Sequence, residues 1–508
     1  MKTSMEEETK ALDTFFNPRS VAIVGATKKV EKAGEIIFKN FVENKTRQVF
    51  KGELYAVNPS EKSILGIQCV QNLSKIPGAV ELAVIVVPAS VVPEIMKEAA
   101  AKKVKAAVII SSGFGEVGNH DLESEVAKIA KDAGIRVLGP NCLGVYDSRT
   151  GVDMLFLPET KVLSTGDEVV ATPRPLPGSI AIVSQSGAFG AAALDYLAGL
   201  HTGASKFVSF GNKIDVDEAD MLRYLYHDRE TTVVLLYVED IKSGRNFIEA
   251  AEEITRKKPV VAIKSGRTDA GARAAASHTG AIAGSDRIYD AAFEQTGVLR
   301  ARDMDEFFHA GKALSMQLPA KGENVAVITD AGGPGIMAVD ECGLVGLNVK
   351  RFSEETVAKF EKLKSEGKLP KFATNFNPVD VTGSGTSEMF ELATEIVYQD
   401  PDIHGVIMMG LHQTPALGED YIDRVVKVSC NYEKPMVACD IGETEMALSI
   451  RLRFDRLGVP AYSSPEDAAR AMNALVRYGL YLQKKGYLEE YVKNFLESKR
   501  KKRVRKGP

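Results

Sequence analysis

The stretch Ile180-Ala-Ile-Val-Ser-Gln-Ser-Gly-Ala-Phe-Gly190 joins a short apolar run to a turn that contains serine and glycine. Successive isoleucine and valine residues are typical of a strand that is buried on both faces, as in a parallel sheet. Serine and glycine directly after such a strand are typical of the turn that opens a following helix. The stretch therefore predicts a strand–turn–helix unit of an α/β protein.

Units of this kind recur along the chain in three consecutive sets. The first set contains the apolar runs Val21–Val24, Leu82–Val87 and Ala106–Ile110, each followed by a turn and an amphipathic stretch. A second set continues through Val233–Val238, and a third begins at Val325–Ile328. Because buried apolar runs that alternate with helical patterns are typical of parallel sheets covered by helices, we expect three consecutive doubly wound α/β domains.

The expected domain boundaries follow from turns and from a proline-rich stretch. The segment 158–178 has four prolines and little periodicity, and prolines at this density favour a linker over a central strand or helix. After the third domain comes a helical stretch that ends in a strongly basic run, which we expect to be a frayed, solvated chain end. The predicted division is a first domain at 1–157, a linker at 158–178, a second domain at 179–318, a third at 319–480, and a helical extension with a basic tail at 481–508.

Composition excludes several classes of protein. The 508 residues contain 64 Lys and Arg against 68 Asp and Glu, a formal net charge of −4, so no overall charge favours binding to nucleic acid. The five cysteines form no CxxC pair and predict neither zinc nor a disulfide framework. Apolar runs fall short of the roughly 20 residues of a membrane span, and the polar start MKTSMEEETK does not resemble a signal peptide. We expect a cytoplasmic protein without a metal centre.

Glycine-bearing turns follow the strands of the first predicted domain in order. They begin at Gly25, Asn58, Pro88, Ser111 and Gly139. Turns at the carboxyl ends of parallel strands expose backbone N–H groups at helix starts, which bind anions. One such turn is weak evidence, because a tight turn explains it equally well, but five in succession favour a cofactor crevice. The second strand has no acidic residue at its end, which disfavours NAD.

Two further features carry possible chemistry in the second predicted domain. The turn Ser184–Gly190 favours a phosphate cradle over a nucleophile elbow, because it lacks the leading glycine of GxSxG. His278 lies among small residues in Arg273-Ala-Ala-Ala-Ser-His-Thr-Gly280, where an accessible imidazole could accept a phosphoryl group, although a packed core histidine is the alternative. Such an imidazole needs a carboxylate on its other nitrogen. Glu239 is the first candidate and Asp240 the second, and a solvated strand end remains the alternative for Glu239.

The motifs GPNCLG, SQSGA, YVEDIKSGRNF and SHTGAIAG occur in this order and together resemble the NDP-forming acyl-CoA synthetases, relatives of succinyl-CoA synthetase. Over residues 12–480 the chain is most similar to the α subunits of archaeal ADP-forming acetyl-CoA synthetases. The resemblance implies a Rossmann-like CoA-binding domain followed by two flavodoxin-like domains. It also implies the reversible conversion of acyl-CoA, ADP and phosphate to acid, CoA and ATP, through an acyl phosphate and a phosphohistidine.

The resemblance also implies which residues form the site. His278 matches the phosphohistidine and Glu239 its supporting carboxylate. The residues matching the phosphate-binding helix start are Ser184, Gln185, Ser186, Gly187 and Ala188. Those implied to contact CoA are Gly25, Ala26, Thr27, Lys32, Asn58, Pro88, Ser112, Gly113, Glu116, Pro140 and Asn141. The third domain's Asp330–Gly335 and Asn377–Gly383 match family motifs to which we assign no role.

No ATP-grasp domain, the family's nucleotide-binding module, is recognisable in the sequence. The resemblance therefore implies a separate ATP-grasp β subunit in an α2β2 assembly, with Mg²⁺ bound together with ADP or ATP on that partner. Two alternatives stay open on the sequence: an α subunit of the succinyl-CoA synthetase type for another acid, and a CoA-sensing binding protein without turnover. The presence of both His278 and Glu239 argues against the binding protein.

Overall fold

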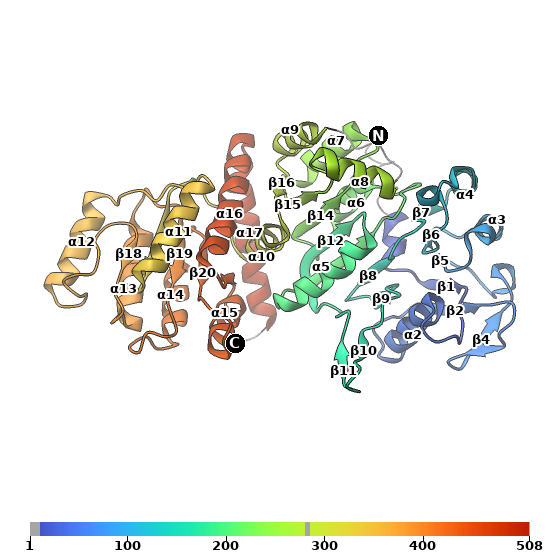
Figure 1. The fold of residues 1–508 in the computed structure, drawn as a ribbon, viewed down its shortest axis with the longest axis horizontal. Helices are drawn as coiled ribbons and strands as arrows, with labels where there is room; N and C mark the ends of the chain where they lie inside the picture. Colours follow the sequence, from blue (N-terminus) through green and yellow to red (C-terminus); the bar gives the residue numbers. More distant parts are fainter. Residues whose placement is uncertain (1–10, 280–284, 507–508) are drawn as a thin grey trace. The chain divides into compact units, whose positions relative to one another are not determined.

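The computed structural model describes residues 11–279 and 285–506, apart from the side chains of 275–279 and 501–506. The chain divides into two compact units, residues 1–300 and 301–508. The first unit holds two large sheets and the second unit holds one, coloured blue, green and orange in Figure 1. All three sheets are built mainly from parallel strands, which confirms the predicted α/β class.

The first sheet has seven strands in the order β3-β4-β2-β1-β5-β6-β7. All neighbours pair in parallel except β3 and β4. Counted along the chain, the six parallel strands stand in the order 3-2-1-4-5-6, which is the Rossmann order. The strands are β1 (Ser20–Val24), β2 (Glu53–Val57), β3 (Ser63–Ile64), β4 (Ile67–Val70), β5 (Leu82–Ile85), β6 (Ala106–Ile109) and β7 (Arg136–Leu138).

Alternate residues of β1 pack on opposite faces of this sheet. Val21 and Ile23 belong to one buried cluster with Phe38 of α2, whereas Ala22 belongs to a second cluster with Met96 of α3. The sheet is therefore covered on both faces, as the continuous apolar runs predict. Its helices are α2 (Ala33–Thr46), α3 (Val92–Ala101) and α4 (His120–Ala133), with short 3₁₀ turns η1 (Asp13–Phe15), η2 (Leu73–Lys75), η3 (Ala89–Val91) and η4 (Gly115–Val117).

The second sheet has the order β16-β15-β14-β12-β13-β8-β9. Counted along the chain, the strands β12 to β16 stand in the flavodoxin-like order 2-1-3-4-5. Strand β8 pairs antiparallel with β13 and extends the sheet at that edge. Strands β8 and β9 precede residue 157, so part of the expected first domain completes the second sheet. The strands are β8 (Val145–Asp147), β9 (Val152–Asp153), β12 (Pro177–Ser184), β13 (Ala204–Ser209), β14 (Val233–Val238), β15 (Val260–Lys264) and β16 (Leu299–Ala301).

The expected linker at 158–178 contains an exposed antiparallel hairpin, β10 (Thr160–Val162) and β11 (Glu168–Val170). Its alternation was too short to distinguish from a loop in the sequence. The helices that accompany the second sheet are α5 (Gly187–Gly199), α6 (Glu218–His227), α7 (Gly244–Ile254), α8 (Asp269–Thr279) and α9 (Asp286–Thr296).

The third sheet is parallel throughout, in the order β18-β17-β19-β20-β21, again 2-1-3-4-5 along the chain. Its strands are β17 (Val325–Thr329), β18 (Val379–Asp380), β19 (Gly405–Met409), β20 (Met436–Cys439) and β21 (Ala461–Tyr462). The helices of this unit are α10 (Met304–Met316), α11 (Gly332–Leu344), α12 (Glu354–Ser365), α13 (Ser387–Gln399), α14 (Tyr421–Ser429), α15 (Glu445–Arg456), α16 (Pro465–Lys485) and α17 (Leu488–Lys506).

Helix α17 differs from the sequence-based expectation, because its backbone stays helical through the basic run to Lys506 instead of fraying. Lysine and arginine have good helix propensity, and cations near a helix C-terminus are stabilised by the helix dipole. Among the residues that the structure describes, no helix is long and apolar enough to cross a membrane.

Candidate active site

The turns predicted to bind CoA lie along the carboxyl-terminal edge of the first sheet. Gly25 follows β1 with φ of +99°, and a Cβ there would lie 2.3 Å from the carbonyl oxygen of Val86, so the turn requires glycine. Asn58 follows β2, and its Nδ2 donates to the carbonyl of Ala26 at 2.7 Å. The turns after β1, β2 and β5 are thus held together at the point where the strand order reverses, which is where open α/β sheets bind ligands.

The first-sheet residues divide into two groups. Ser112, Glu116 and Asn141 line a cavity of about 690 Å³ that they share with the second sheet. The other predicted CoA contacts lie along the edge outside the lining of that cavity, namely Gly25, Ala26, Thr27, Lys32, Asn58, Pro88, Gly113 and Pro140. An edge of this extent suits a long ligand that places only one end in the cavity.

The centre of the second sheet joins Gln185 to the two acidic residues after β14. Gln185 follows β12, and its Oε1 accepts the backbone N–H groups of Glu239 at 2.9 Å and Asp240 at 3.0 Å. Its Nε2 donates to Oδ1 of Asp240. Strands β12 and β14 are neighbours at the reversal of strand order, so Gln185 holds the acidic residues at the expected ligand position. The hydrogen-bonding groups of its side chain are therefore occupied by Glu239 and Asp240.

Glu239 and Asp240 differ in what surrounds their carboxylates. Oδ1 of Asp240 also lies 3.3 Å from Nζ of Lys213, so this carboxylate is committed to buried protein partners. Glu239 is 8% exposed and lines the cavity, and its Oε1 accepts the hydroxyl of Tyr237 at 3.3 Å. Both residues line the cavity, but it is Asp240 that pairs with Lys213, whereas Glu239, the first candidate from the sequence, contacts Tyr237.

The predicted phosphate-binding turn opens helix α5. The Ser186 hydroxyl caps this helix by accepting the N–H of Phe189 at 3.2 Å, and the buried Ser184 hydroxyl donates to the carbonyl of Ser186 at 2.7 Å. Both hydroxyls thus shape the turn. The first N–H groups of the helix, at Gly187 and Ala188, have no intrahelical acceptor and line the same cavity. An anion here would be bound chiefly by backbone N–H groups and the helix dipole.

The opposite wall of the cavity contains a network that the sequence analysis missed. Nδ2 of Asn212 donates to Oε2 of Glu116 at 2.6 Å and to Oε2 of Glu123 at 2.7 Å. Burial acts to raise the pKa of Glu116, but hydrogen bonds from Asn212 and from the N–H of Gly113 hold it below its usual range. Glu116 therefore orders its own turn. Asn212 lies just after the buried strand β13. In the sequence, this position after a strand is the one signal that could have indicated a role in the site.

The apolar part of the cavity comes from residues that were not among the predicted site residues. These residues belong to the ends of the first sheet, the segment after β9, and α5. They are Ile110, Cys142, Leu143, Phe156, Leu157 and Ala191. The cavity thus combines an apolar wall with a helix N-terminus and a buried carboxylate, a combination typical of small-molecule sites.

His278 lies in the last turn of helix α8, and its side chain is outside the described residues. Helix α8 packs beside η4, the turn that carries Glu116 and lines the cavity. The backbone of the helix that bears His278 is therefore close to the cavity of Gln185 and Glu239. Among the described residues there is no group of three side chains arranged to hold a metal ion.

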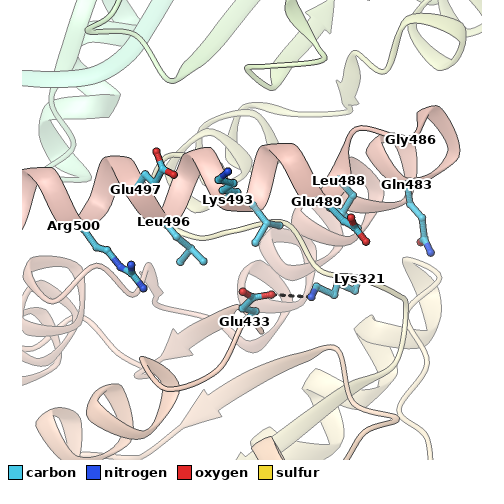
Figure 2. A pocket seen from close by; sticks show the side chains of 11 residues that line it. Lys321, Glu433, Gln483, Gly486, Leu488, Glu489, Lys493, Leu496, Glu497 and Arg500 are labelled. Carbon is cyan, nitrogen blue, oxygen red and sulfur yellow. Dashed lines mark hydrogen bonds and ion pairs between the residues drawn. The ribbon is translucent and has the colours of Figure 1, made fainter.

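A second cavity, of about 780 Å³, lies in the unit 301–508 along α17 (Figure 2). It is crossed by the ion pair between Lys321 and Glu433 at 2.9 Å, and Leu488 and Leu496 of α17 contribute apolar contacts. This groove contains none of the predicted site residues.

Family models match three consecutive segments of the chain. They describe a CoA binding domain at residues 19–148, a succinyl-CoA ligase like flavodoxin domain at 177–314, and a Ligase-CoA domain at 325–478. The order of these domains and the cavity between the first two sheets define a protein of the CoA ligase class.

Individual relatives narrow this class. The chain is 38% identical over 473 residues to the acetate–CoA ligase [ADP-forming] II subunit alpha of Pyrococcus furiosus, with 92% of this chain and 97% of that one covered. It is 36% identical to the acetate–CoA ligase [ADP-forming] of Methanocaldococcus jannaschii, where the match covers 94% of this chain and 65% of that protein. The chain belongs to the family of ADP-forming acetate–CoA ligases.

A solved structure agrees with this assignment. The dinucleotide forming acetyl-coenzyme A synthetase 1 of Ca. Korarchaeum cryptofilum, in complex with phosphate and ADP, superposes with a TM-score of 0.83 at 34% identity. The match covers 93% of this chain and 98% of that one. The predicted succession of a Rossmann-like and two flavodoxin-like sheets is thereby confirmed.

Proposed function

We propose that the chain is the α subunit of an ADP-forming acyl-CoA synthetase that forms acyl phosphate and then phosphohistidine. The observation that carries this proposal is the placement of Glu239 by Gln185 beside the N-terminus of α5, in a cavity adjoining the helix of His278. A helix N-terminus stabilises a phosphoryl group, and a buried carboxylate holds an imidazole in one tautomer. These are the two requirements of a phosphohistidine site.

The chemistry proceeds in two displacements. A phosphate oxygen attacks the thioester carbonyl carbon, the carbon–sulfur bond breaks, and CoA leaves as the thiol after taking up a proton. The imidazole nitrogen of His278 then attacks the phosphorus of the acyl phosphate, and the carboxylate leaves with the bridging oxygen. The N–H groups of Gly187 and Ala188 stabilise the charge on the transferred phosphoryl group, and Glu239 stabilises the imidazolium that develops.

CoA would lie along the carboxyl-terminal edge of the first sheet. Its phosphates would contact the backbone of the glycine turn at Gly25 and the ammonium of Lys32, which is exposed at the start of α2. The thioester end would enter the cavity past Asn141, toward the N-terminus of α5. The remaining predicted contacts, Ala26, Thr27, Asn58, Pro88, Ser112, Gly113, Glu116 and Pro140, order or flank these turns.

The last transfer, from phosphohistidine to ADP, would take place on a separate ATP-grasp β subunit in an α2β2 assembly, with Mg²⁺ supplied together with the nucleotide. Support comes from relatives named as alpha subunits, and from a single-chain relative of which this chain covers 65%. We place this enzyme in the cytoplasm, where CoA and ADP are available.

Phosphoryl labelling tests the proposal directly. Incubation with acetyl-CoA, [³²P]phosphate and Mg²⁺ is expected to give an acid-labile, base-stable adduct that maps to His278. The absence of an adduct in folded protein that binds CoA would show the catalytic proposal to be wrong. ATP formation is expected only after addition of an ATP-grasp subunit, and turnover by this chain alone would contradict the division of labour.

A further inference from the structure

The ammonium of Lys213 is buried beneath the proposed phosphohistidine site. Its side chain is 1% exposed, and Nζ lies 2.8 Å from Oε1 of Glu218. Nζ also donates to the backbone carbonyl of Asp240 at 2.8 Å and lies 3.3 Å from Oδ1 of that residue. The three donors of an ammonium are therefore all directed at protein acceptors. Burial acts to lower the pKa of Lys213, but Glu218 and Asp240 hold it above its usual range.

The backbone at Lys213 adopts a conformation that disfavours residues with a side chain. Its φ is +55°, in the left-handed region that non-glycine residues occupy only at an energetic cost. This strained position directs the ammonium at the carbonyl of Asp240 rather than out to solvent. Strain that brings a buried charge to one strand end is a feature of functional sites.

Gln185 and Lys213 both bind Asp240, and Gln185 binds Glu239 as well. Gln185 accepts the N–H groups of Glu239 and Asp240, while Lys213 donates to the carbonyl of Asp240, and both donate to its carboxylate. Gln185 therefore fixes the peptide unit between Glu239 and Asp240, and Lys213 fixes the next one, between Asp240 and Ile241. Because Glu239 immediately precedes Asp240, this clamp sets where the Glu239 carboxylate stands in the cavity.

We propose that Lys213 is a positioning residue for phosphoryl transfer. Together with Gln185 and Asp240, it holds the Glu239 carboxylate in the position needed to support the phosphorylated imidazole. The proposal rests on the proposed function. A purely structural lysine–glutamate pair could be replaced by uncharged side chains of similar size with little effect. A hydrogen bond from the ammonium to the Asp240 carbonyl cannot be replaced in this way, and displacement of a catalytic group by 1 Å can lower a rate about a hundredfold.

The chain provides a matched control in Lys206 of β13. Its side chain is also buried, at 7% exposed, and its Nζ lies 3.0 Å from Asp147 and 3.2 Å from Asp228. Lys206 pairs in register with Ala181, three residues before the carboxyl end of β12. Like Lys213, it is buried and has two acidic partners, but those partners are different residues. In the described part of the chain, Lys206 forms no hydrogen bond or ion pair with Gln185, Glu239 or Asp240.

The test compares the double variant Lys213→Met/Glu218→Gln with the double variant Lys206→Met/Asp147→Asn, so that each replaces a buried lysine together with one buried acidic partner. Changing Glu218 at the same time avoids leaving a buried carboxylate without its cation, which would unfold the protein for an unrelated reason. The rate of phosphorylation is measured in single turnovers with [³²P]phosphate over a range of acetyl-CoA concentrations. We expect the maximal rate of the double variant to fall at least about tenfold while the half-saturating acetyl-CoA concentration stays within about twofold. Lys206→Met/Asp147→Asn should change neither value by more than about twofold.

A combination with Glu239→Gln separates positioning from general stability. If Lys213 acts through Glu239, adding the Lys213→Met/Glu218→Gln changes to Glu239→Gln should cause almost no further loss of rate. Gln185→Glu provides a second route, because it retains an acceptor for the two N–H groups, removes the donor to Asp240 and places a second carboxylate against that of Asp240. We expect it to lower the maximal rate about fivefold.

The proposal would be overturned by a wild-type maximal rate in Lys213→Met/Glu218→Gln, by an equal loss in Lys206→Met/Asp147→Asn, or by fully additive losses with Glu239→Gln. Absence of the adduct from the wild-type protein would instead overturn the proposed function, so the two failures can be told apart.

Discussion

The carboxyl-terminal edges of the second and third sheets share one strand order but arrange their polar groups differently. At the second edge, Gln185 and Lys213 supply hydrogen-bond donors to Asp240. At the third edge, Oδ2 of Asp330 and Oδ2 of Asp440 are buried and, within the described part of the chain, have no hydrogen-bond partner. Burial raises the pKa of Asp440 to about 6, despite its hydrogen bond with His412. The same topology thus yields a satisfied cluster in one place and an unsatisfied one in another.

The third edge also contains a histidine held by a buried carboxylate. Nδ1 of His412 lies 2.6 Å from Oδ1 of Asp440, an arrangement of the kind proposed for His278 and Glu239. The helix starts differ, however, because α5 is capped by Ser186 whereas α11 has Ala331 at its N-cap without a side-chain hydrogen bond. A histidine–carboxylate pair at a strand end is therefore insufficient evidence for a phosphohistidine, and its surroundings decide its chemistry.

Replacing each histidine should give the largest contrast between the two edges. We expect His278→Ala to abolish the phosphoryl adduct while CoA binding is retained, because the acceptor nitrogen is removed. His412→Ala should retain the adduct at the wild-type level. Both are measured by ³²P labelling and by CoA titration, and loss of labelling in His412→Ala would show that the third edge also takes part in the transfer.

The unsatisfied carboxyl of Asp440 should make stability depend on pH. Its pKa in the folded state, about 6, lies above the value of about 4 for an unfolded aspartate. The folded protein therefore binds the proton more tightly, and the unfolding free energy should fall by about 2 to 3 kcal/mol as the pH rises from about 4 to about 6. Asp440→Asn should remove this slope, as measured by calorimetric unfolding between pH 4.5 and pH 7.

Glu81 provides a control of opposite sign in the first sheet. Burial acts to raise its pKa, but hydrogen bonds from Arg19 and Lys105 lower it to about 2. Its stabilising effect is therefore complete above about pH 4.5 and is lost only as the pH falls toward 2. Glu81→Gln should leave the slope between pH 5 and pH 7 unchanged, and an unchanged slope in Asp440→Asn would contradict our interpretation of the third edge.

The smallest expected effect concerns the two helix starts. Ser186→Ala removes the cap of α5 and should lower the unfolding free energy by about 1 kcal/mol. Ala331→Ser introduces a hydroxyl at an extended N-cap, with φ of −134° and ψ of 107°, and should raise it by about 0.5 kcal/mol. Thermal unfolding of both variants measures the difference, and equal effects of the same sign would show that the two helix starts do not differ as described.

Local sequence patterns were sufficient to predict most strands and the α/β class. Runs such as Val233–Val238 and Val325–Ile328 are apolar throughout, and they form buried parallel strands as expected. The hairpin within 158–178 was missed because each of its strands has three residues, all exposed. The membership of Val145–Asp147 in the second sheet could not be predicted, since pairing across domains leaves no local pattern.

The predicted site also divides into residues with a local sequence signal and residues whose role depends on distant partners. Ser186, Gly187 and Glu239 could be selected because serine and glycine after a strand, or an acidic residue at a strand end, are local signals. Asn212 and Lys213 could not, because their significance depends on partners distant in sequence, Glu116 and Glu123 for Asn212 and Asp240 for Lys213. The place of Gln185 in the phosphate-binding turn stays a prediction, and the sequence could not show that its side chain binds Glu239 and Asp240.

The sequence by itself determined the strand–turn–helix units, the glycine at residue 25 and the positions of His278 and Glu239, because these depend on local periodicity, backbone conformation and residue type. The tertiary structure alone decided which strand ends meet, that the partners of Glu239 and Asp240 differ, and that a buried lysine contacts Asp240. Those outcomes depend on desolvation and on hydrogen bonds between residues tens of positions apart, and such interactions arise only when the sheets are assembled.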